Sequence, residues 1–301
     1  MRSRILALTT ALTLLVSPLA SQAKDLTVFA QEGSFVHGVS SAGEVNFFNL
    51  EDFGPEDRRI DDLSLSPDQT RLAYICANET DGYLWTGELK IAELGKEIDL
   101  SYKGVDMTIV DCPNVQRFDF DDYNLFSLDW GPNGRLIVAD GMDRRIRSNK
   151  VQLYLIDTIG GTIDVLHTGP SYNMNPTWGD DNRIYFETIA NKGLAVLDLR
   201  TREVSAFGKT SMEWENPDAC EAGIVFSSKS ENGTSNVYLA DYDGRVRGLV
   251  DDGIDHETPR WSTDCETVFY DSGIETFAID IDKVYEPWPV TQMFRHQDQE
   301  D

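Results

Sequence analysis

The stretch Pro176-Thr-Trp-Gly-Asp-Asp-Asn-Arg-Ile-Tyr-Phe186 decides the fold, because versions of it recur along the chain. It comprises the end of one strand, a tight turn of Gly, Asp and Asn residues, and an apolar strand, which together predict a β-hairpin. Repeats about forty residues apart, each containing several short strands, are typical of a β-propeller. The other copies span Leu63–Tyr74, Leu128–Val138, Pro217–Phe226 and Pro259–Tyr270.

One place in the repeat, here called the tryptophan position, carries Trp in three of the five copies. An aromatic residue repeated at a fixed place usually packs between neighbouring blades of a propeller. We therefore expect Trp178 and Trp261 to stabilise the ring rather than to bind a ligand. The five occupants of the tryptophan position are Leu65, Trp130, Trp178, Ala219 and Trp261.

The second half of each repeat contains an apolar strand that ends in an acidic residue, then a turn and a fourth strand such as Val246–Val250. Four strands per unit make one propeller blade. Three strand-like runs near the N-terminus, Leu26–Phe29, Ser34–His37 and Glu44–Leu50, lack the repeat and are interpreted as a degenerate blade or as strands that close the ring. The prediction is an all-β chain forming a single propeller of six four-stranded antiparallel blades, one of them degenerate, with five blades as the alternative.

The N-terminus has the pattern of a secretory signal peptide: a basic start at Met1–Arg4, an apolar run from Ile5 to Ala20, and small residues at Ser21 and Ala23. The alternative, a membrane anchor, is disfavoured because the apolar run is short for a membrane span. We predict a signal peptide at 1–23, the propeller at 24–283 and a tail at 284–301. The mature chain is expected to be periplasmic or secreted, with no membrane insertion after cleavage.

The chain is strongly acidic, with 52 Asp and Glu residues against 26 Lys and Arg and a net charge of −26. Phosphate recognition requires a positive surface, so a nucleic-acid partner is not expected. Anionic lipid is an unsuitable partner for the same reason. The acidity is interpreted as a contribution to solubility, and we expect a monomer.

Four cysteines fit an oxidising compartment. Cys220 and Cys265 lie in or beside the first hairpin turn of neighbouring repeats, and equivalent turns of adjacent blades lie side by side. We predict a Cys220–Cys265 bridge and a Cys76–Cys112 bridge, the second holding the long insertion after the first repeat. Each bridge is expected to contribute ~2–4 kcal/mol to stability.

The pattern Pro-x-Trp-Ser/Gly-x-Asp-x-x-x-Ile/Val-x-Phe, followed by Val-Tyr-Leu-x-Asp, resembles the TolB-type propeller repeat. That repeat occurs in the periplasmic protein TolB, in oligogalacturonate lyases and in the propeller part of prolyl oligopeptidases. The resemblance covers about Ile60 to Asp282 and implies the fold rather than a function. TolB carries an α/β domain before its propeller, whereas only Lys24–Asp57 lie between the predicted signal and the first repeat here.

Motifs for catalysis or cofactor binding are not found in the sequence. It has no G-x-S-x-G nucleophile elbow, no P-loop and no G-x-G-x-x-G. The acidic run Asp119–Asn124 lacks the Gly and Glu of a calcium-binding EF-hand loop. The four histidines, His37, His167, His256 and His296, are too widely spread to predict a three-histidine metal centre. We therefore expect no cofactor and no bound metal, although a mixed histidine and carboxylate site stays open.

A candidate ligand site follows from the repeats, because the ring axis brings equivalent residues of different blades together. The residues just before the Pro or Leu that opens each copy lie where the inner strand begins. A Trp ring, an imidazole and amides on adjacent blades would suit a sugar or a peptide loop. The candidates are Asp62, Asn175, Asn216 and Thr258, with Asn173, Trp214 and His256 two residues earlier; Ser127 is the equivalent in the remaining copy.

Two functions from different classes are compatible with these features. The first is an exported, non-enzymatic propeller that binds an envelope protein, a small molecule or a carbohydrate at its channel face. The alternative is a carbohydrate-active enzyme such as a polysaccharide lyase, using His256 with channel carboxylates and a divalent metal. The insertion between Gly95 and Asn124 is a competing place for contact with a partner, because insertions map to loops on one face of a propeller.

Overall fold

Strands make up the regular structure of the residues that can be described. In a computed structural model, the described residues are 26–31, 35–40, 45–50, 58–80, 84–102, 105–118, 120, 122–146, 150–167, 169, 172–179, 182–188, 193–208, 212–230, 232–272, 275–282 and 288–289. Among them, no helix is long and apolar enough to cross a membrane. The predicted signal peptide at 1–23 and most of the predicted tail at 284–301 lie outside the described residues.

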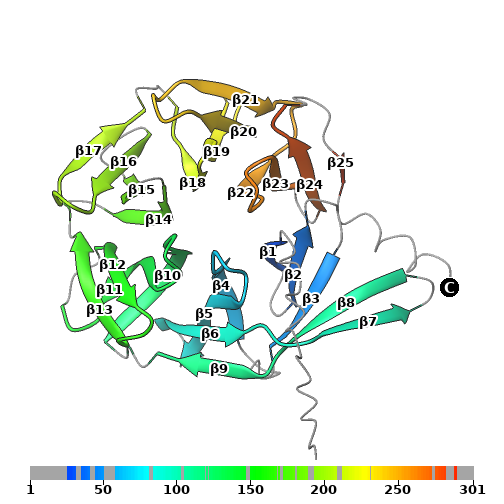
Figure 1. The fold of residues 1–301 in the computed structure, drawn as a ribbon. Coiled ribbons are helices and arrows are strands. Elements are labelled where there is room, and N and C mark those ends of the chain that lie inside the picture. The colour runs from blue at the N-terminus through cyan, green and yellow to red at the C-terminus, as the bar shows by residue number, and fades with distance from the viewer. Residues whose placement is uncertain are drawn as a thin grey trace, which may run out of the picture.

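Five four-stranded antiparallel sheets stand around a common axis as the blades of a propeller (Figure 1). In each blade the hairpin predicted from the repeat forms the two innermost strands. Blade 1 comprises β4 (Arg58–Leu65), β5 (Arg71–Thr80), β6 (Leu84–Glu93) and β9 (Asn114–Arg117). Blade 2 comprises β10 (Tyr123–Trp130), β11 (Leu136–Asp143), β12 (Gln152–Asp157) and β13 (Thr162–His167). Blade 3 comprises β14 (Asn173–Trp178), β15 (Arg183–Thr188), β16 (Leu194–Asp198) and β17 (Val204–Phe207). Blade 4 comprises β18 (Glu215–Cys220), β19 (Gly223–Lys229), β20 (Ser235–Ala240) and β21 (Val246–Val250). Blade 5 comprises β22 (Glu257–Trp261), β23 (Thr267–Ser272), β24 (Glu275–Asp280) and β25 (Trp288–Pro289).

The sixth sheet differs from the blades because it combines two separate parts of the chain. Strands β1 (Leu26–Gln31), β2 (Phe35–Ser40) and β3 (Val45–Leu50) are antiparallel, and β3 pairs in parallel with β8 (Val105–Cys112), which pairs with β7 (Glu97–Tyr102). Figure 1 shows β1, β2 and β3 between blade 5 and blade 1. The regular blades thus number five, the alternative count, and the long insertion predicted from the sequence supplies the β7–β8 hairpin and β9.

Tryptophan side chains pack between neighbouring blades, as predicted. Trp178 of blade 3 packs in one apolar cluster with Val138 and Leu153 of blade 2. Trp261 of blade 5 packs in another with residues of blade 4, including Val225. The two Trp side chains are only 7% and 6% exposed. Their apolar area is therefore removed from water by the contact between blades, which stabilises the ring.

A β-bulge recurs in the first strand of every blade, just before the tryptophan position. The register shifts between Met174 and Thr177 in blade 3, at the equivalent places in blades 4 and 5, and slightly earlier in the strand in blades 1 and 2. The bulge residues Asn175, Asn216 and Thr258 have positive φ angles of 47°, 51° and 48°. Asn tolerates this left-handed conformation better than a β-branched residue does, so Thr258 is the unusual member. A bulge re-aims side chains, and here it does so next to the channel.

One of the two predicted cysteine bridges is present. Cys220 at the end of β18 is joined to Cys265 in the turn after β22, with the Cα atoms 6.1 Å apart. The predicted Cys76–Cys112 bridge is wrong, because the structure does not join these two residues. Both are fully buried in one apolar cluster with Phe48, and the Cys112 thiol donates to the carbonyl oxygen of Val110. Buried thiols of this kind act as small apolar side chains.

Candidate functional site

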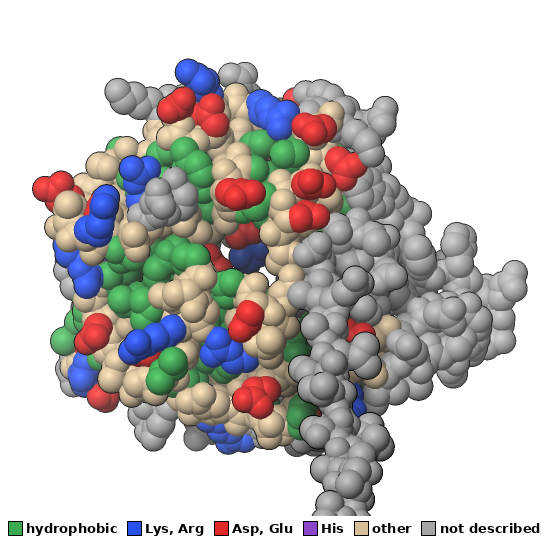
Figure 2. Space-filling model, viewed as in Figure 1, with side chains coloured by type: hydrophobic (Ala, Val, Ile, Leu, Met, Phe, Trp, Pro, Cys, Tyr) green, Lys and Arg blue, Asp and Glu red, His purple; other side chains and the backbone are tan. Residues whose placement is uncertain are grey.

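The residue just before the tryptophan position is here called the channel position, and four of its five occupants line one pocket, Thr177 being buried. Its five occupants come from the five inner strands. Figure 2 shows a hollow at the centre of the molecule in which both acidic and basic side chains are visible. Charged residues therefore line a passage that apolar strands surround. The occupants of the channel position are Ser64, Asp129, Thr177, Asp218 and Arg260.

Residues at the channel position accept hydrogen bonds from the next blade. The Oδ2 atom of Asp129 accepts from the backbone N–H of Trp178 at 2.7 Å. The Oδ2 atom of Asp218 accepts from the N–H of Trp261 at 2.6 Å. Thr177 repeats the contact with a hydroxyl, since its Oγ1 accepts from the N–H of Ala219 at 2.9 Å. Each of these contacts joins one blade to the following one.

A second row of carboxylates binds the bulges. Asp140 accepts the N–H of Asn175 at 2.9 Å and that of Ser127, in its own blade, at 2.8 Å. Glu187 accepts the N–H of Asn216 at 2.6 Å and the side-chain amide of Asn175 at 2.7 Å. The left-handed bulge directs these N–H groups away from the β-ladder, and the carboxylates satisfy them. We call both rows together the interblade carboxylate contacts.

Arg260 joins the last blade to the first. Its Nη2 donates to Oδ1 of Asp62 at 3.0 Å, and Oδ2 of Asp62 accepts the N–H of Leu128 at 2.8 Å. The Arg260 side chain is 33% exposed and that of Asp62 is 12% exposed, so the ion pair lies at the edge of the open channel. Although burial lowers the pKa of Arg260, the carboxylates of Asp62 and its neighbours outweigh burial and raise it. The guanidinium therefore stays charged.

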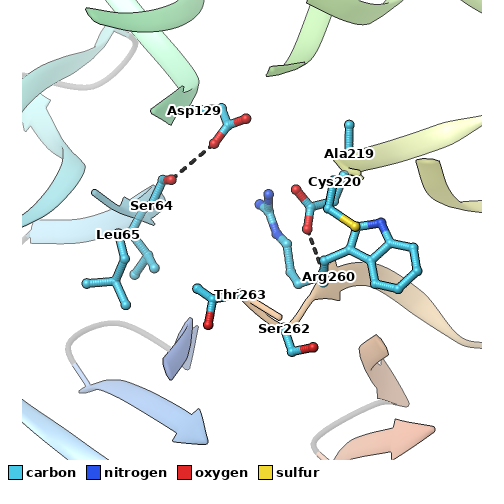
Figure 3. A pocket seen from close by; sticks show the side chains of 11 residues that line it. Ser64, Leu65, Asp129, Ala219, Cys220, Arg260, Ser262 and Thr263 are labelled. Carbon is cyan, nitrogen blue, oxygen red and sulfur yellow. Dashed lines mark hydrogen bonds between the residues drawn. The ribbon is translucent and has the colours of Figure 1, made fainter. Parts of the chain in front are cut away.

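These residues enclose a pocket of about 230 Å³, shown in Figure 3. In that view the Arg260 side chain extends towards Asp129, whose carboxylate accepts from the Ser64 hydroxyl at 3.1 Å. Two carboxylates and one guanidinium thus share the pocket with hydroxyl and apolar groups. The lining residues are Leu63, Ser64, Leu65, Asp129, Asp218, Ala219, Cys220, Arg260, Trp261, Ser262 and Thr263.

Burial governs the ionisation of the channel carboxylates. It raises the pKa of Asp129 to about 7, and the nearby Asp218 carboxylate adds to this. Burial also raises the pKa of Asp140 to about 7, although two backbone N–H groups oppose the shift. The pKa of Asp62 is raised by burial even though Arg260 lowers it, which is consistent with a deeply placed carboxylate whose cation lies nearer the solvent. The pocket therefore changes charge near neutral pH.

The raised pKa values predict that stability falls as pH rises. The pKa values of Asp129 and Asp140 lie near 7 in the folded protein against a usual 3.8, so the folded state binds these protons more tightly than the unfolded state. Their stabilising effect is fully present below the unfolded pKa and is lost as pH rises to about 7. Urea denaturation should therefore give a lower free energy of unfolding at pH 8 than at pH 5.

A matched pair of variants tests this pH dependence. Asp140→Asn removes one titrating group and should make the dependence shallower. Asp243→Asn, at a side chain that is 75% exposed in an outer turn, should leave it as in the unsubstituted protein. A free energy of unfolding that rises between pH 5 and pH 8 would contradict the assignment of buried, proton-binding carboxylates.

Comparison with solved structures finds proteins of similar fold. A protein assigned as TolB from Agrobacterium tumefaciens matches 83% of this chain and 84% of its own, with a TM-score of 0.61 and 16% sequence identity. The fold resembles the TolB propeller. TolB from Acinetobacter baumannii matches 81% of this chain with a TM-score of 0.55 and 12% identity, and the match spans 56% of that protein.

At these identities the likeness shows the fold alone. A nidogen/laminin complex also matches, over 87% of this chain and 92% of that chain, with a TM-score of 0.58 and 11% identity. No family model matches the chain, and no curated protein matches it in sequence. A TolB-like propeller can carry many activities, so the function has to be argued from the pocket itself.

Four of the predicted site residues take part in contacts within and between the blades of this TolB-like propeller, and none of the four lines the pocket. Asn175 and Asn216 lie 3.3 Å apart, amide nitrogen to amide oxygen. Asp62 pairs with Arg260. The Thr258 hydroxyl donates to Asp271 at 2.8 Å. These side chains stabilise the bulges and the contact between the last blade and the first.

Three other predicted site residues do not line the channel pocket, since they are buried between strands and blades. Trp214 is 3% exposed and stacks on Phe226, with ring centroids 4.0 Å apart. Asn173 is 2% exposed and donates to the Val151 carbonyl at 3.2 Å. His256 is equally buried, with Nε2 2.7 Å from Oδ1 of Asp252. The intervening bulge is the reason, because it breaks the alternation of faces along the strand.

Sequence reasoning missed the three charged members of the channel position. Asp129, Asp218 and Arg260 each occupy the middle position of the Pro-x-Trp phrase or of its Leu-x-Trp and Pro-x-Ala variants, between apolar neighbours. A charged residue in a buried inner strand is rare unless it has a partner or a function. That signal was present in the sequence and pointed to the pocket.

Metal binding finds no support in the described part of the chain, where no group of three or more His, Cys, Asp or Glu residues could hold an ion. The acidic run considered for calcium is described only in part. Of it, Asp122 forms an ion pair with Arg145 at 3.4 Å.

Proposed function

We propose that this protein is an exported, non-enzymatic TolB-like propeller that binds a partner at the pocket in its channel. The observation that carries the proposal is the placement of Arg260 beside Asp129 and Asp218 in an open pocket. Charged side chains are costly to withdraw from water, so a structural role alone would favour neutral hydroxyls, as at Ser64 and Thr177. Strands β1–β3 act as the degenerate sixth blade in this proposal.

Export is supported by two features that do not depend on the pocket. The Cys220–Cys265 bridge is consistent with an oxidising compartment outside the cytoplasm. The N-terminal sequence has the pattern of a cleaved secretory signal. A periplasmic or secreted monomer that meets an envelope protein or a small ligand fits both features.

The enzymatic alternative loses its proposed base. A lyase mechanism assigned His256 to the channel, together with carboxylates and a divalent metal. In the structure His256 is 3% exposed and lies edge-on to Tyr270 with ring centroids 5.0 Å apart. A general base has to come within hydrogen-bond reach of the proton it abstracts, and this position offers a substrate no access.

Closing the pocket tests the proposed function. Thr263 is an exposed residue of the pocket lining, so Thr263→Trp should fill the entrance with little effect on folding. Tagged protein is used to capture partners from an envelope extract of the source cells, followed by mass spectrometry. We expect a partner that is retained by the unsubstituted protein and lost with Thr263→Trp.

Glu266→Trp is the matched control, because Glu266 is an exposed residue of the same turn that does not line the pocket. It should capture the partner as the unsubstituted protein does. If Thr263→Trp captures the partner equally well, the contact lies on another surface, and the β7–β8 hairpin is the first alternative.

A further inference from the structure

The charges in the channel pocket are not balanced within it. Asp129 and Asp218 line the pocket, and both are bound by neutral donors: Trp178 N–H and the Ser64 hydroxyl for Asp129, and Trp261 N–H for Asp218. Among the described residues, the ion pair of Arg260 is made to Asp62 rather than to either of these two. When both carboxylates are ionised, the pocket lining therefore carries two negative charges against the single positive charge of Arg260.

The neutral donors also fix the direction of both carboxylates. Backbone N–H groups of two different blades bind them, at 2.7 Å for Asp129 and 2.6 Å for Asp218. A carboxylate that is held by the backbone cannot swing out to solvent. Such preorganised groups bind a ligand without first losing side-chain freedom.

The pocket also has the space and the access that a ligand group needs. Its volume of about 230 Å³ is measured with Arg260 in place, and a water molecule takes up only about 30 Å³. Solvent reaches the pocket, since Arg260 is 33% exposed and Asp129 and Asp218 are both partly exposed. The guanidinium of Arg260, paired with Asp62 of blade 1, shows that a planar cation fits between the inner strands.

We infer that the channel pocket accepts a basic group, a guanidinium or ammonium on an extended chain such as the arginine or lysine side chain of a partner's peptide segment. This inference rests on the proposed function and names the chemistry of its ligand. With Asp129 and Asp218 both ionised, a second cation beside them would balance the negative charge that remains after that of Arg260 is counted. An anionic ligand would instead have to approach Arg260 past both carboxylates.

A pair of nearly isosteric probes tests the inference. N-acetyl-arginine methylamide carries the guanidinium, and N-acetyl-citrulline methylamide replaces it with a neutral urea of the same shape. Titration calorimetry at low salt should give a Kd for the arginine probe about tenfold or more below that of the citrulline probe. Equal affinity of the two probes would overturn the inference.

Variants locate the binding in the pocket. Asp129→Asn and Asp218→Asn should each weaken the arginine probe about tenfold, while Asp243→Asn, which removes the same charge from an exposed outer turn, should not. Near-ultraviolet circular dichroism checks that each variant is folded, and the comparison of the two probes needs no variant. Binding that is insensitive to both channel substitutions would also overturn the inference.

A further measurement in the same experiment distinguishes a protein partner from a small amine as the source of the basic group. A six-residue peptide with one central arginine that binds more tightly than the single-residue probe indicates a protein partner, whereas equal affinity indicates a small amine. Failure of the inference is distinguishable from failure of the proposed function. If Thr263→Trp still abolishes partner capture while the two probes bind equally, the channel binds a ligand of other chemistry.

Discussion

Replacing Trp214 by Ala should lower the free energy of unfolding by about 3–5 kcal/mol. The side chain is 3% exposed, its ring stacks on Phe226 with an interplanar angle of 7°, and it meets Phe207 edge-on at 5.9 Å. The backbone also packs closely against the Trp214 ring at Gly208, where an added Cβ atom would lie only 2.7 Å from the ring. Truncation would leave a cavity that these fixed neighbours cannot fill.

Urea denaturation measures the effect, and Tyr172→Ala is the control. Tyr172 is 39% exposed, so its truncation should change stability by no more than about 0.5 kcal/mol. Trp214→Phe keeps an aromatic ring against Phe226 and should cost less than the Ala variant. A Trp214→Ala protein with normal stability that no longer captures a partner would restore the ligand-binding role first predicted for this residue.

Replacing Arg260 by Met should destabilise the protein by about 3 kcal/mol at pH 8, the lower end of the range for breaking a buried ion pair. The lower end applies because the Arg260 side chain is 33% exposed and water screens part of the interaction. Loss of the cation leaves Asp62 without its ion-pair partner beside Asp129 and Asp218. The cost should be smaller at pH 5, where these carboxylates take up protons more readily once the guanidinium is absent.

A double-mutant cycle decides whether the Arg260–Asp62 ion pair itself is responsible for this loss of stability. Adding Asp62→Asn to Arg260→Met removes the stranded charge and should restore part of the lost stability, giving a coupling energy well above experimental error. Urea denaturation of the four proteins at pH 8 provides the measurement. Strictly additive effects would mean that Arg260 stabilises the ring through packing alone.

Local patterns were enough to predict the hairpins and the packing of Trp178 and Trp261 between blades. They were also enough for the Cys220–Cys265 bridge, because equivalent turns of adjacent blades must lie together. In each case the inference needed only the strand period and the repeat spacing.

The errors in the candidate site have one physical origin. Asn173 and Asn175 are two residues apart, and in a regular strand they would face the same side. Asn175 adopts a φ of 47° in a bulge, so Asn173 turns into the interior while Asn175 stays at the channel. The residue types give only a weak sign of the bulge, since Asn, which tolerates a positive φ, occupies it in two blades but Thr occupies it in a third.

The Arg260–Asp62 pair could not be predicted from local patterns, because it depends on closure of the whole ring. The missing Cys76–Cys112 bridge is a related case. Cys112 lies in β8, which leaves blade 1 to pair with β3, and the path of an insertion is set by tertiary packing rather than by the repeat.

The contacts between blades differ in the length of chain that they enclose, which sets an order of events in folding. Those from Trp178 to Asp129, Ala219 to Thr177 and Trp261 to Asp218 span 49, 42 and 43 residues, whereas Arg260 to Asp62 spans 198. Closing a longer loop costs more chain entropy, and distant contacts form more slowly than near ones. Neighbouring blades can therefore dock as soon as both exist, while the Arg260–Asp62 pair has to wait until blade 5 has been made and brought round to blade 1.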